Sequence, residues 1–138
     1  MNLAFSEINW LGVVIATLTY SAFSGMWHRQ FAFGKQWEKA MGFERPDQWK
    51  ETNIYYIIPL IGCFVASVSI GLLNYHLRIN SLSSAIFLGL TVGIGIALTT
   101  TFTNAVIPIM KKPTTFALIT GTAHVISLTL VSVLIYLI

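Results

Sequence analysis

Charged residues are scarce in this sequence of 138 residues. Asp, Glu, Lys and Arg together make up 9% of it, whereas a soluble domain carries about 25%. Hydrophobic residues make up 55%, which excludes an intrinsically disordered chain, because such chains are poor in apolar residues and rich in charge. The composition also argues against a soluble globule, since eight basic and five acidic residues cannot cover the surface of a 15.3 kDa protein.

Cysteine is almost absent as well. Cys63 is the single cysteine and cannot form a disulfide within the chain. The three histidines, His28, His76 and His124, fall at different depths of the helices predicted below, so one subunit cannot gather them around a metal ion. The sequence also has no phosphate-binding glycine loop, no zinc-type spacing and no Gly-x-Ser-x-Gly nucleophile motif. We therefore predict no metal, no cofactor and no catalytic residue, and expect that the protein is not an enzyme.

The formal net charge is +3, which raises the question of nucleic-acid binding. Basic residues alternate with acidic ones between Arg29 and Glu51, and they form no stripe interleaved with stacking aromatics. A nucleic-acid-binding surface requires such a basic stripe or patch. We therefore expect no nucleic-acid partner. The basic residues of the loops are better explained by their effect on membrane orientation and by attraction to anionic lipid headgroups.

Long uncharged stretches separate the charged islands. Each is long enough to cross a hydrocarbon core about 30 Å thick as a helix of roughly 20 residues. We therefore predict an all-α fold, an integral membrane four-helix bundle in which residues 1–138 form one transmembrane domain surrounded by the lipid bilayer. The expected helices cover residues 8–27, 54–75, 83–106 and 114–136, with a short interfacial helix over residues 35–41 in the first loop.

The basic residues are distributed unequally between the two sides of such a bundle. Four crossings put both chain termini on one side, where Arg78 is the only Lys or Arg. The positive-inside bias places the side richer in Lys and Arg in the cytoplasm. We therefore expect a multi-pass protein of the cytoplasmic (inner) membrane, with the first loop in the cytoplasm and both termini outside. The richer side contains Arg29, Lys35, Lys39, Arg45, Lys50, Lys111 and Lys112.

The segment 35–41 of the first loop has an amphipathic pattern. Trp37 and Met41 are four residues apart and share one face of a helix, whereas Lys35 is available to the other face. This pattern is typical of a short helix that lies in the headgroup region. We assign Arg29, Lys35 and Trp37 to interfacial positions that fix the loop at the mouth of the bundle.

A stripe of small residues runs along the third predicted helix at intervals of four. In lipid, small residues allow two helices to approach closely, and this packing replaces the missing hydrophobic drive. The stripe therefore predicts a close helix contact, with a partner either in the same chain or in another copy of a homo-oligomer. Its central members are Ala85, Gly89, Gly93 and Ala97.

No Asp, Glu, Lys or Arg lies in the central part of any predicted crossing. This argues against a carrier that couples transport to a buried ionisable group. What remains is His124 and several hydroxyl and amide side chains on the first, third and fourth helices. Because an imidazole in the membrane interior needs a partner or water, His124 is either a structural residue bonded to Thr17 or to a threonine of the third helix, or a ligand-binding residue. The candidate ligand-binding residues are His124, Asn104, Thr100, Thr120, Thr17 and Ser21.

Several of these residues together resemble a known family. The sequence is similar to a bacterial membrane family known as domain of unknown function 1761. The resemblance covers nearly the whole chain and implies a four-helix bacterial inner-membrane protein with no assigned activity. The residues that carry it are Trp10, Gly25-x-Trp27, Phe33-Gly34-Lys35-x-Trp37, Gly42, the threonine-rich run to Asn104, and His124.

Two functions from different classes are consistent with these features. The first is a non-enzymatic membrane protein that binds or passes a small solute through a polar pocket in its cytoplasmic half. The alternative is a structural or accessory membrane protein, which packs against a partner or lipid through the small-residue stripe. Hydroxyls in membrane helices often bond to their own backbone, so the polar residues alone do not distinguish the two.

Overall fold

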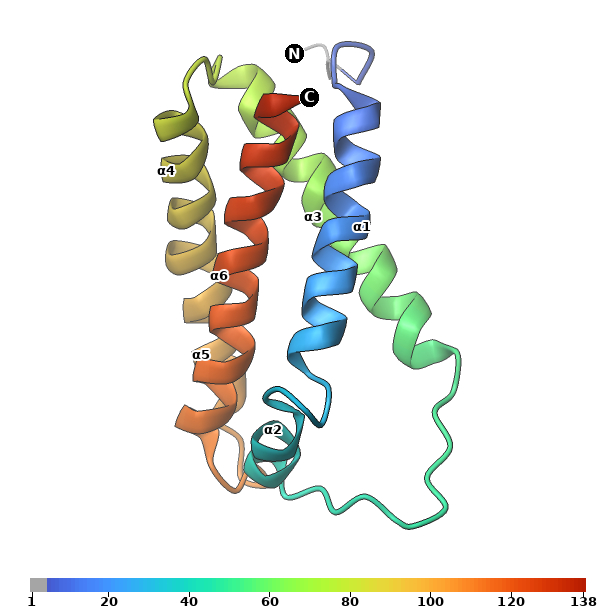
Figure 1. Ribbon diagram of the computed structural model, residues 1–138. Helices are drawn as coiled ribbons and strands as arrows, with labels where there is room; N and C mark the ends of the chain where they lie inside the picture. The colour runs from blue at the N-terminus through green and yellow to red at the C-terminus, as the bar shows by residue number, and fades with distance from the viewer. Residues whose placement is uncertain (1–4) are drawn as a thin grey trace.

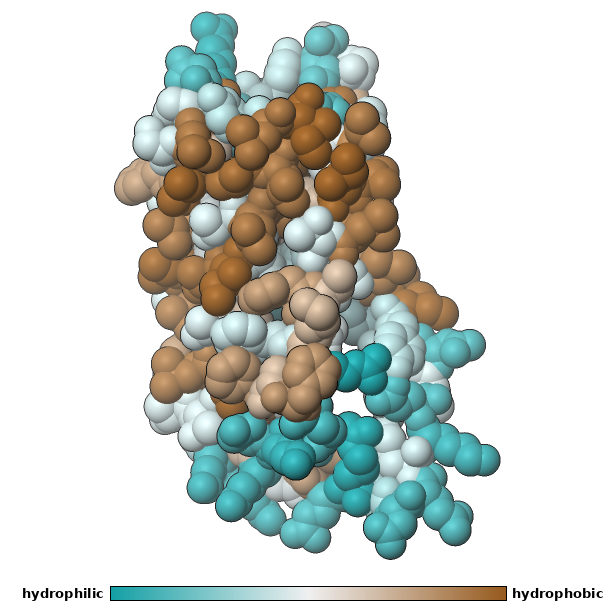
Figure 2. All heavy atoms as spheres, in the orientation of Figure 1, coloured by the Kyte–Doolittle hydropathy of each residue, from teal (hydrophilic) through white to brown (hydrophobic). Residues whose placement is uncertain are grey.

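The computed structural model describes residues 5–138 and is helical throughout its regular parts (Figure 1). The predicted all-α class is confirmed. Four helical runs are long and apolar enough to cross a membrane, and an apolar band lies between two polar ends (Figure 2). The elements are α1 (Trp10–Trp27), α2 (Gly34–Met41), α3 (Ile54–His76), α4 (Leu82–Val92), a π-helical segment η1 (Gly93–Leu98), α5 (Thr99–Ala105) and α6 (Pro113–Leu137).

Local sequence signals explain where the helices begin and end. Asn9 caps α1 by accepting a hydrogen bond from the Gly12 N–H at 3.0 Å, and Ser81 caps α4 in the same way through Ser84. Pro113 occupies the first turn of α6, where its missing N–H costs nothing. Each long helix therefore begins within two residues of its predicted position.

Helix α6 is the centre of the bundle and packs against α1, α2, α3, α4, η1 and α5. Fully buried Val13 of α1, Ile70 of α3 and Val131 of α6 meet in its core. The start of α1 and the C-terminus lie at one end, which we call the terminal end, and α2 lies at the other, the loop end (Figure 1). This arrangement agrees with four crossings.

The third membrane-spanning run differs from the prediction of one regular helix over residues 83–106. It is α-helical in α4 and α5 but π-helical over Gly93–Leu98. In a regular helix, Ala85 and Ala105 would lie about 200° apart around the axis, because four residues advance about 40° beyond a full turn. Both are fully buried. The wider π turn contains one residue more than an α turn, which reduces this angle between Ala85 and Ala105 by about 100°. The small-residue stripe therefore stays on the inner face.

The small-residue stripe packs against α6 of the same chain. Gly89 lies so close to the backbone of Thr129 that an added Cβ would overlap it, and at Gly93 a Cβ would be 2.8 Å from the Val125 Cα. Ala85 is also fully buried, and Ala97 is half-buried. The stripe therefore brings α4 and η1 against α6, so it is not available to an external partner.

Helix α2 is docked under the loop end of α6. The Lys112 N–H donates a hydrogen bond of 2.9 Å to the carbonyl of Ala40, so the last turn of α2 is joined to the start of α6. Gly42 ends α2 with φ at +80°, a left-handed conformation that glycine adopts without strain, and the Lys111 side chain packs over it. The predicted interfacial helix over residues 35–41 is therefore confirmed as a helix.

Candidate functional site

The intramembrane histidine forms a hydrogen bond with a tyrosine of α1. The hydroxyl of Tyr20 and the Nδ1 of His124 are 2.6 Å apart, and the two rings meet edge to face. Either atom can be the donor, depending on the imidazole tautomer. In both cases the Nε2 is left to act as a donor or an acceptor toward another group, since no described residue forms a hydrogen bond with it.

This contact corrects the predicted partner of His124. Thr17 donates its hydroxyl proton to the carbonyl of Val13 at 2.8 Å, within its own helix. Three threonines of the third membrane-spanning run likewise donate their hydroxyl protons to backbone carbonyls of that run, as Thr101 does to Ala97. The partner is Tyr20 because it lies on the buried face of α1 opposite α6, and its phenol reaches farther than a threonine hydroxyl.

A tryptophan of α2 closes the site toward the loop end. Trp37 donates from Nε1 to the Thr120 hydroxyl at 3.0 Å and stacks on Phe116, with ring centroids 6.0 Å apart. The ring of His28 meets Trp37 edge-on at 5.2 Å. Trp37 therefore covers Thr120, which lies one turn before His124 on α6.

A second tryptophan joins α1 directly to α6. Trp27 donates from Nε1 to the carbonyl of Ile119 at 3.0 Å and packs against Phe33 with ring centroids 4.4 Å apart. Ile119 directly precedes Thr120, so this bond fixes α1 and α6 beside the site. Together the two tryptophans hold the turn between α1 and α2 against α6.

The six predicted ligand-binding residues divide into two groups. His124 and Thr120 face α1 and α2, and half-buried Ser21 directly follows Tyr20. Thr17 is buried one turn before Tyr20 on α1, with its hydroxyl bonded to Val13. Thr100 and Asn104 are exposed on the outside of α5 and do not join them. Ala105 is fully buried in the same helix, and Asn104 and Thr100 lie about 100° and 140° from it around the axis, which explains their outer position.

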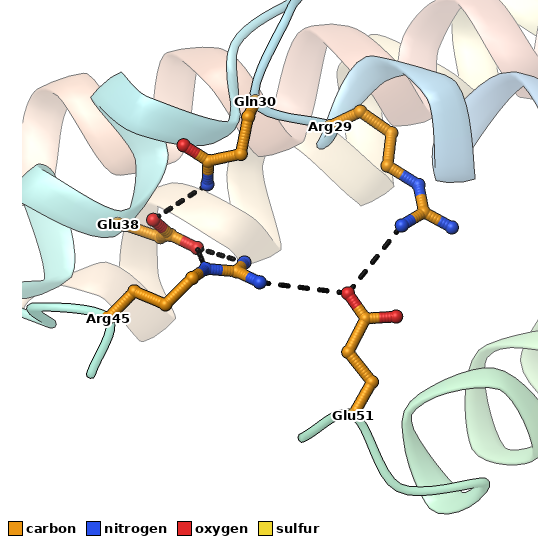
Figure 3. A network of polar contacts seen from close by, with 5 residues as sticks. All are labelled: Arg29, Gln30, Glu38, Arg45 and Glu51. Carbon is orange, nitrogen blue, oxygen red and sulfur yellow. Dashed lines mark hydrogen bonds and ion pairs between the residues drawn. The ribbon is translucent and has the colours of Figure 1, made fainter. Parts of the chain in front are cut away.

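The first loop contains a network of charged side chains at the loop end (Figure 3). Glu38 of α2 is 8% exposed, and it accepts hydrogen bonds from Arg45 and, at 2.8 Å, from Gln30. Arg45 NH1 and Arg29 NH1 lie 3.7 Å and 3.5 Å from the Oε1 of Glu51. The bond to Glu38 raises the pKa of Arg45 above its ordinary value. The network joins the ends of α1 and α2 to the residues that precede α3.

The three predicted interfacial residues have different surroundings. Trp37 reaches into the bundle, as described above. Arg29 lies at the end of α1 in the charged network, and Lys35 is exposed on the outer side of α2. Trp37 and Arg29 therefore contact other parts of the chain at the loop end, whereas Lys35 has no described contact, and the interfacial anchoring role stays a prediction.

Helix α3 contributes buried polar atoms that sequence reasoning missed. Asn74 donates from Nδ2 to the Ser132 carbonyl at 3.2 Å. The Asn74 Oδ1 and the hydroxyls of Ser67, Ser127 and Ser132 are buried without a partner among the described residues. Asn74, an amide in an otherwise apolar run, was the signal in the sequence, since such residues bond between helices in lipid. These atoms lie toward the terminal end, away from Trp37.

A pH dependence follows from His28, which caps the end of α1. Its Nδ1–H donates to the Ser24 carbonyl at 2.9 Å, and burial lowers its pKa below the ordinary value of 6.5. Below that value the unfolded chain takes up the proton more readily than the folded one, so the folded state loses stability as the pH falls. We expect the melting temperature in detergent to drop between pH 7.5 and 5.5, and less so in His28→Gln. His76→Gln at the terminal end is the control and should keep the full drop.

The fold and these contacts define the class of protein. It is a helical membrane protein with four spanning segments and a loop helix docked at one end. Residues 11–136 match the model of a protein family of unknown function, DUF1761, and the chain belongs to this family. No curated protein and no solved structure matches the chain.

Proposed function

We propose that this membrane protein binds a small polar solute between α1 and α6, and that α2 covers the site. The observation that carries the proposal is the hydrogen bond between Tyr20 and His124. A phenol and an imidazole in the hydrocarbon region are costly unless they are bonded or functional. This pair leaves the Nε2 of His124 available to one further group.

The neighbouring residues fit a solute that carries a hydrogen-bond donor or acceptor. Ser21 and Thr120 supply hydroxyls close to Tyr20 and His124 in the chain, and no Asp, Glu, Lys or Arg is among these four residues. A neutral polar solute needs no counter-charge in such a site. The proposal is one of binding and assigns no catalytic role to these residues.

The cover is formed by α2. The bond from Trp37 to Thr120 and the backbone bond from Lys112 to Ala40 hold this helix beneath α6. We propose that the loop end, which is rich in Lys and Arg, faces the cytoplasm of the inner membrane. A solute would then enter from the cytoplasm when α2 moves away.

The test uses a single reactive cysteine in a Cys63→Ala background. Ser21→Cys is expected to react with a charged methanethiosulfonate reagent added to the cytoplasmic side of membrane vesicles, and not with reagent added to the other side. Trp37→Ala should raise the rate about tenfold, because one lost hydrogen bond of about 1 to 1.5 kcal/mol shifts an opening equilibrium by that factor.

Thr100→Cys is the matched control. Thr100 lies about 7.5 Å from the loop-end limit of α5, and Ser21 about 9 Å from that of α1, so the two depths are similar. Thr100 is exposed on the outer face, where lipid excludes a charged reagent. Equal protection of the cysteines at 21 and 100, with and without Trp37, would refute the solute site.

The accessory function has less support from the structure. The small-residue stripe is covered by α6, so a partner cannot use that surface. A homo-oligomer would have to form through other faces of the bundle, and it remains a proposal that size measurement in detergent can test.

A further inference from the structure

Helix α3 leaves the bundle toward the loop end. Every residue from 51 to 62 is exposed, whereas the inner face is buried from Cys63 onward. Figure 1 shows the first turns of α3 diverging from α1. The separated part is strongly apolar, with exposed Ile54, Ile57 and Ile58.

The divergence leaves an apolar groove of about 310 Å³ between α1 and α3. It is lined by Val14, Thr17 and Leu18 of α1 and by Leu60, Ile61 and Phe64 of α3. The hydroxyl of Thr17 is bonded to the Val13 carbonyl, so it offers the groove no free proton. In a bilayer hydrocarbon has to fill this space, since an empty groove forfeits dispersion contacts on both walls.

The depth of the groove matches one acyl chain of the leaflet at the loop end. Thr17 and Arg29 are twelve residues apart, which is about 18 Å along a helix. Half of the hydrocarbon core is about 15 Å thick. The groove therefore lies near the bilayer midplane when Arg29 lies at the level of the lipid headgroups.

The charges at that level favour an anionic headgroup. The guanidinium groups of Arg29 and Arg45 share one oxygen of Glu51, and their side chains are 50% and 38% exposed (Figure 3). Each guanidinium has five N–H donors and pairs well with phosphate, so both retain donors for a further anion. The loop end has seven Lys and Arg against four acidic residues, which are Glu38, Glu44, Asp47 and Glu51.

We propose that the α1–α3 groove is a binding site for one anionic glycerophospholipid. Its acyl chain lies between Leu18 and Ile61, and its phosphate bonds to Arg29 and Arg45. The site is separate from the proposed solute site, because it opens sideways to the lipid rather than under α2.

The test is native mass spectrometry of the full chain, delipidated and then mixed with phosphatidylglycerol or phosphatidylcholine of identical chains. The wild type is expected to retain one phosphatidylglycerol in preference to phosphatidylcholine. Arg29→Gln should reduce that preference about tenfold, as expected for the loss of a charge-assisted bond of about 1.5 kcal/mol. Lys39→Gln removes one exposed charge of α2 outside the network and should leave the preference unchanged.

A second variant tests the groove itself. Leu18→Trp fills the space, so it should reduce retention of both lipids while the melting temperature stays near that of the wild type. The proposal is overturned if the wild type shows no preference, if Lys39→Gln acts as strongly as Arg29→Gln, or if Leu18→Trp leaves retention unchanged. It is also overturned if the delipidated chain dimerises and Leu18→Trp abolishes the dimer, since the groove would then hold a second copy.

Discussion

Gly89→Ala is expected to lower the free energy of unfolding by about 1 to 3 kcal/mol, the usual cost of forcing extra atoms into a packed interior. The added methyl group would overlap the backbone of Thr129, which cannot rotate away as a side chain can. Helix α4 would have to move off α6, which would weaken contacts along the whole small-residue stripe. Thermal unfolding in detergent, or steric trapping in bicelles, measures the change.

Gly95 provides the matched control for this substitution. It lies in the same helical run, six residues after Gly89, and a Cβ there would meet nothing within 4 Å. Gly95→Ala should therefore be neutral or slightly stabilising, since alanine is the better helix former. Equal effects at the two positions would show that backbone propensity, and not contact with α6, determines the cost.

Gly34→Ala is expected to detach α2 from the bundle. Gly34 lies against the carbonyl of His28, and a Cβ would overlap that oxygen and come within 2.7 Å of the Arg29 carbonyl carbon. The turn from α1 into α2 would have to open, at a cost of about 1 to 3 kcal/mol. That cost is at least as large as the contribution of about 1 kcal/mol from either bond that docks α2, Trp37–Thr120 or Lys112–Ala40, so the docking should weaken.

Hydrogen–deuterium exchange measures the detachment of α2. Amides of residues 34–41 should exchange about fivefold faster or more in Gly34→Ala, because local opening becomes easier by about 1 kcal/mol or more. Gly25→Ala is the control, since Gly25 is near the same end of α1 and has open space around it. Unchanged exchange in Gly34→Ala would mean that the turn is not needed to dock α2.

The number and limits of the membrane helices could be predicted from the sequence because lipid imposes a simple rule. A span needs a long uncharged run, and the charges between Arg29 and Glu51 divide such runs. The loop helix was predictable as well, since Gly34 and Gly42 bracket it and Trp37 and Met41 share one face. Each of these signals acts locally along the chain.

The polar site was only partly predictable because it depends on which faces meet. His124 and Thr120 were recognised as polar residues within an apolar run. Tyr20 was missed, since an aromatic residue in a membrane helix gives no sign of whether its hydroxyl has a partner. Thr100 and Asn104 were included because they are polar residues in the loop-end half of the third run, and polarity alone does not show which face of a helix a residue occupies.

The π-helical segment Gly93–Leu98 has a consequence for how the gene can vary in length. The segment contains one residue more than ordinary α turns would, and this residue changes the angle of α5 around the helix axis relative to α4. Deleting one residue there would restore an ordinary helix and leave both Gly89 and Ala105 on their present faces, because the π turn already takes up that residue, whereas deleting one residue of α5 before Ala105 would turn Ala105 by about 100°. Single-codon deletions should therefore be tolerated better in this segment than in α4 or α5.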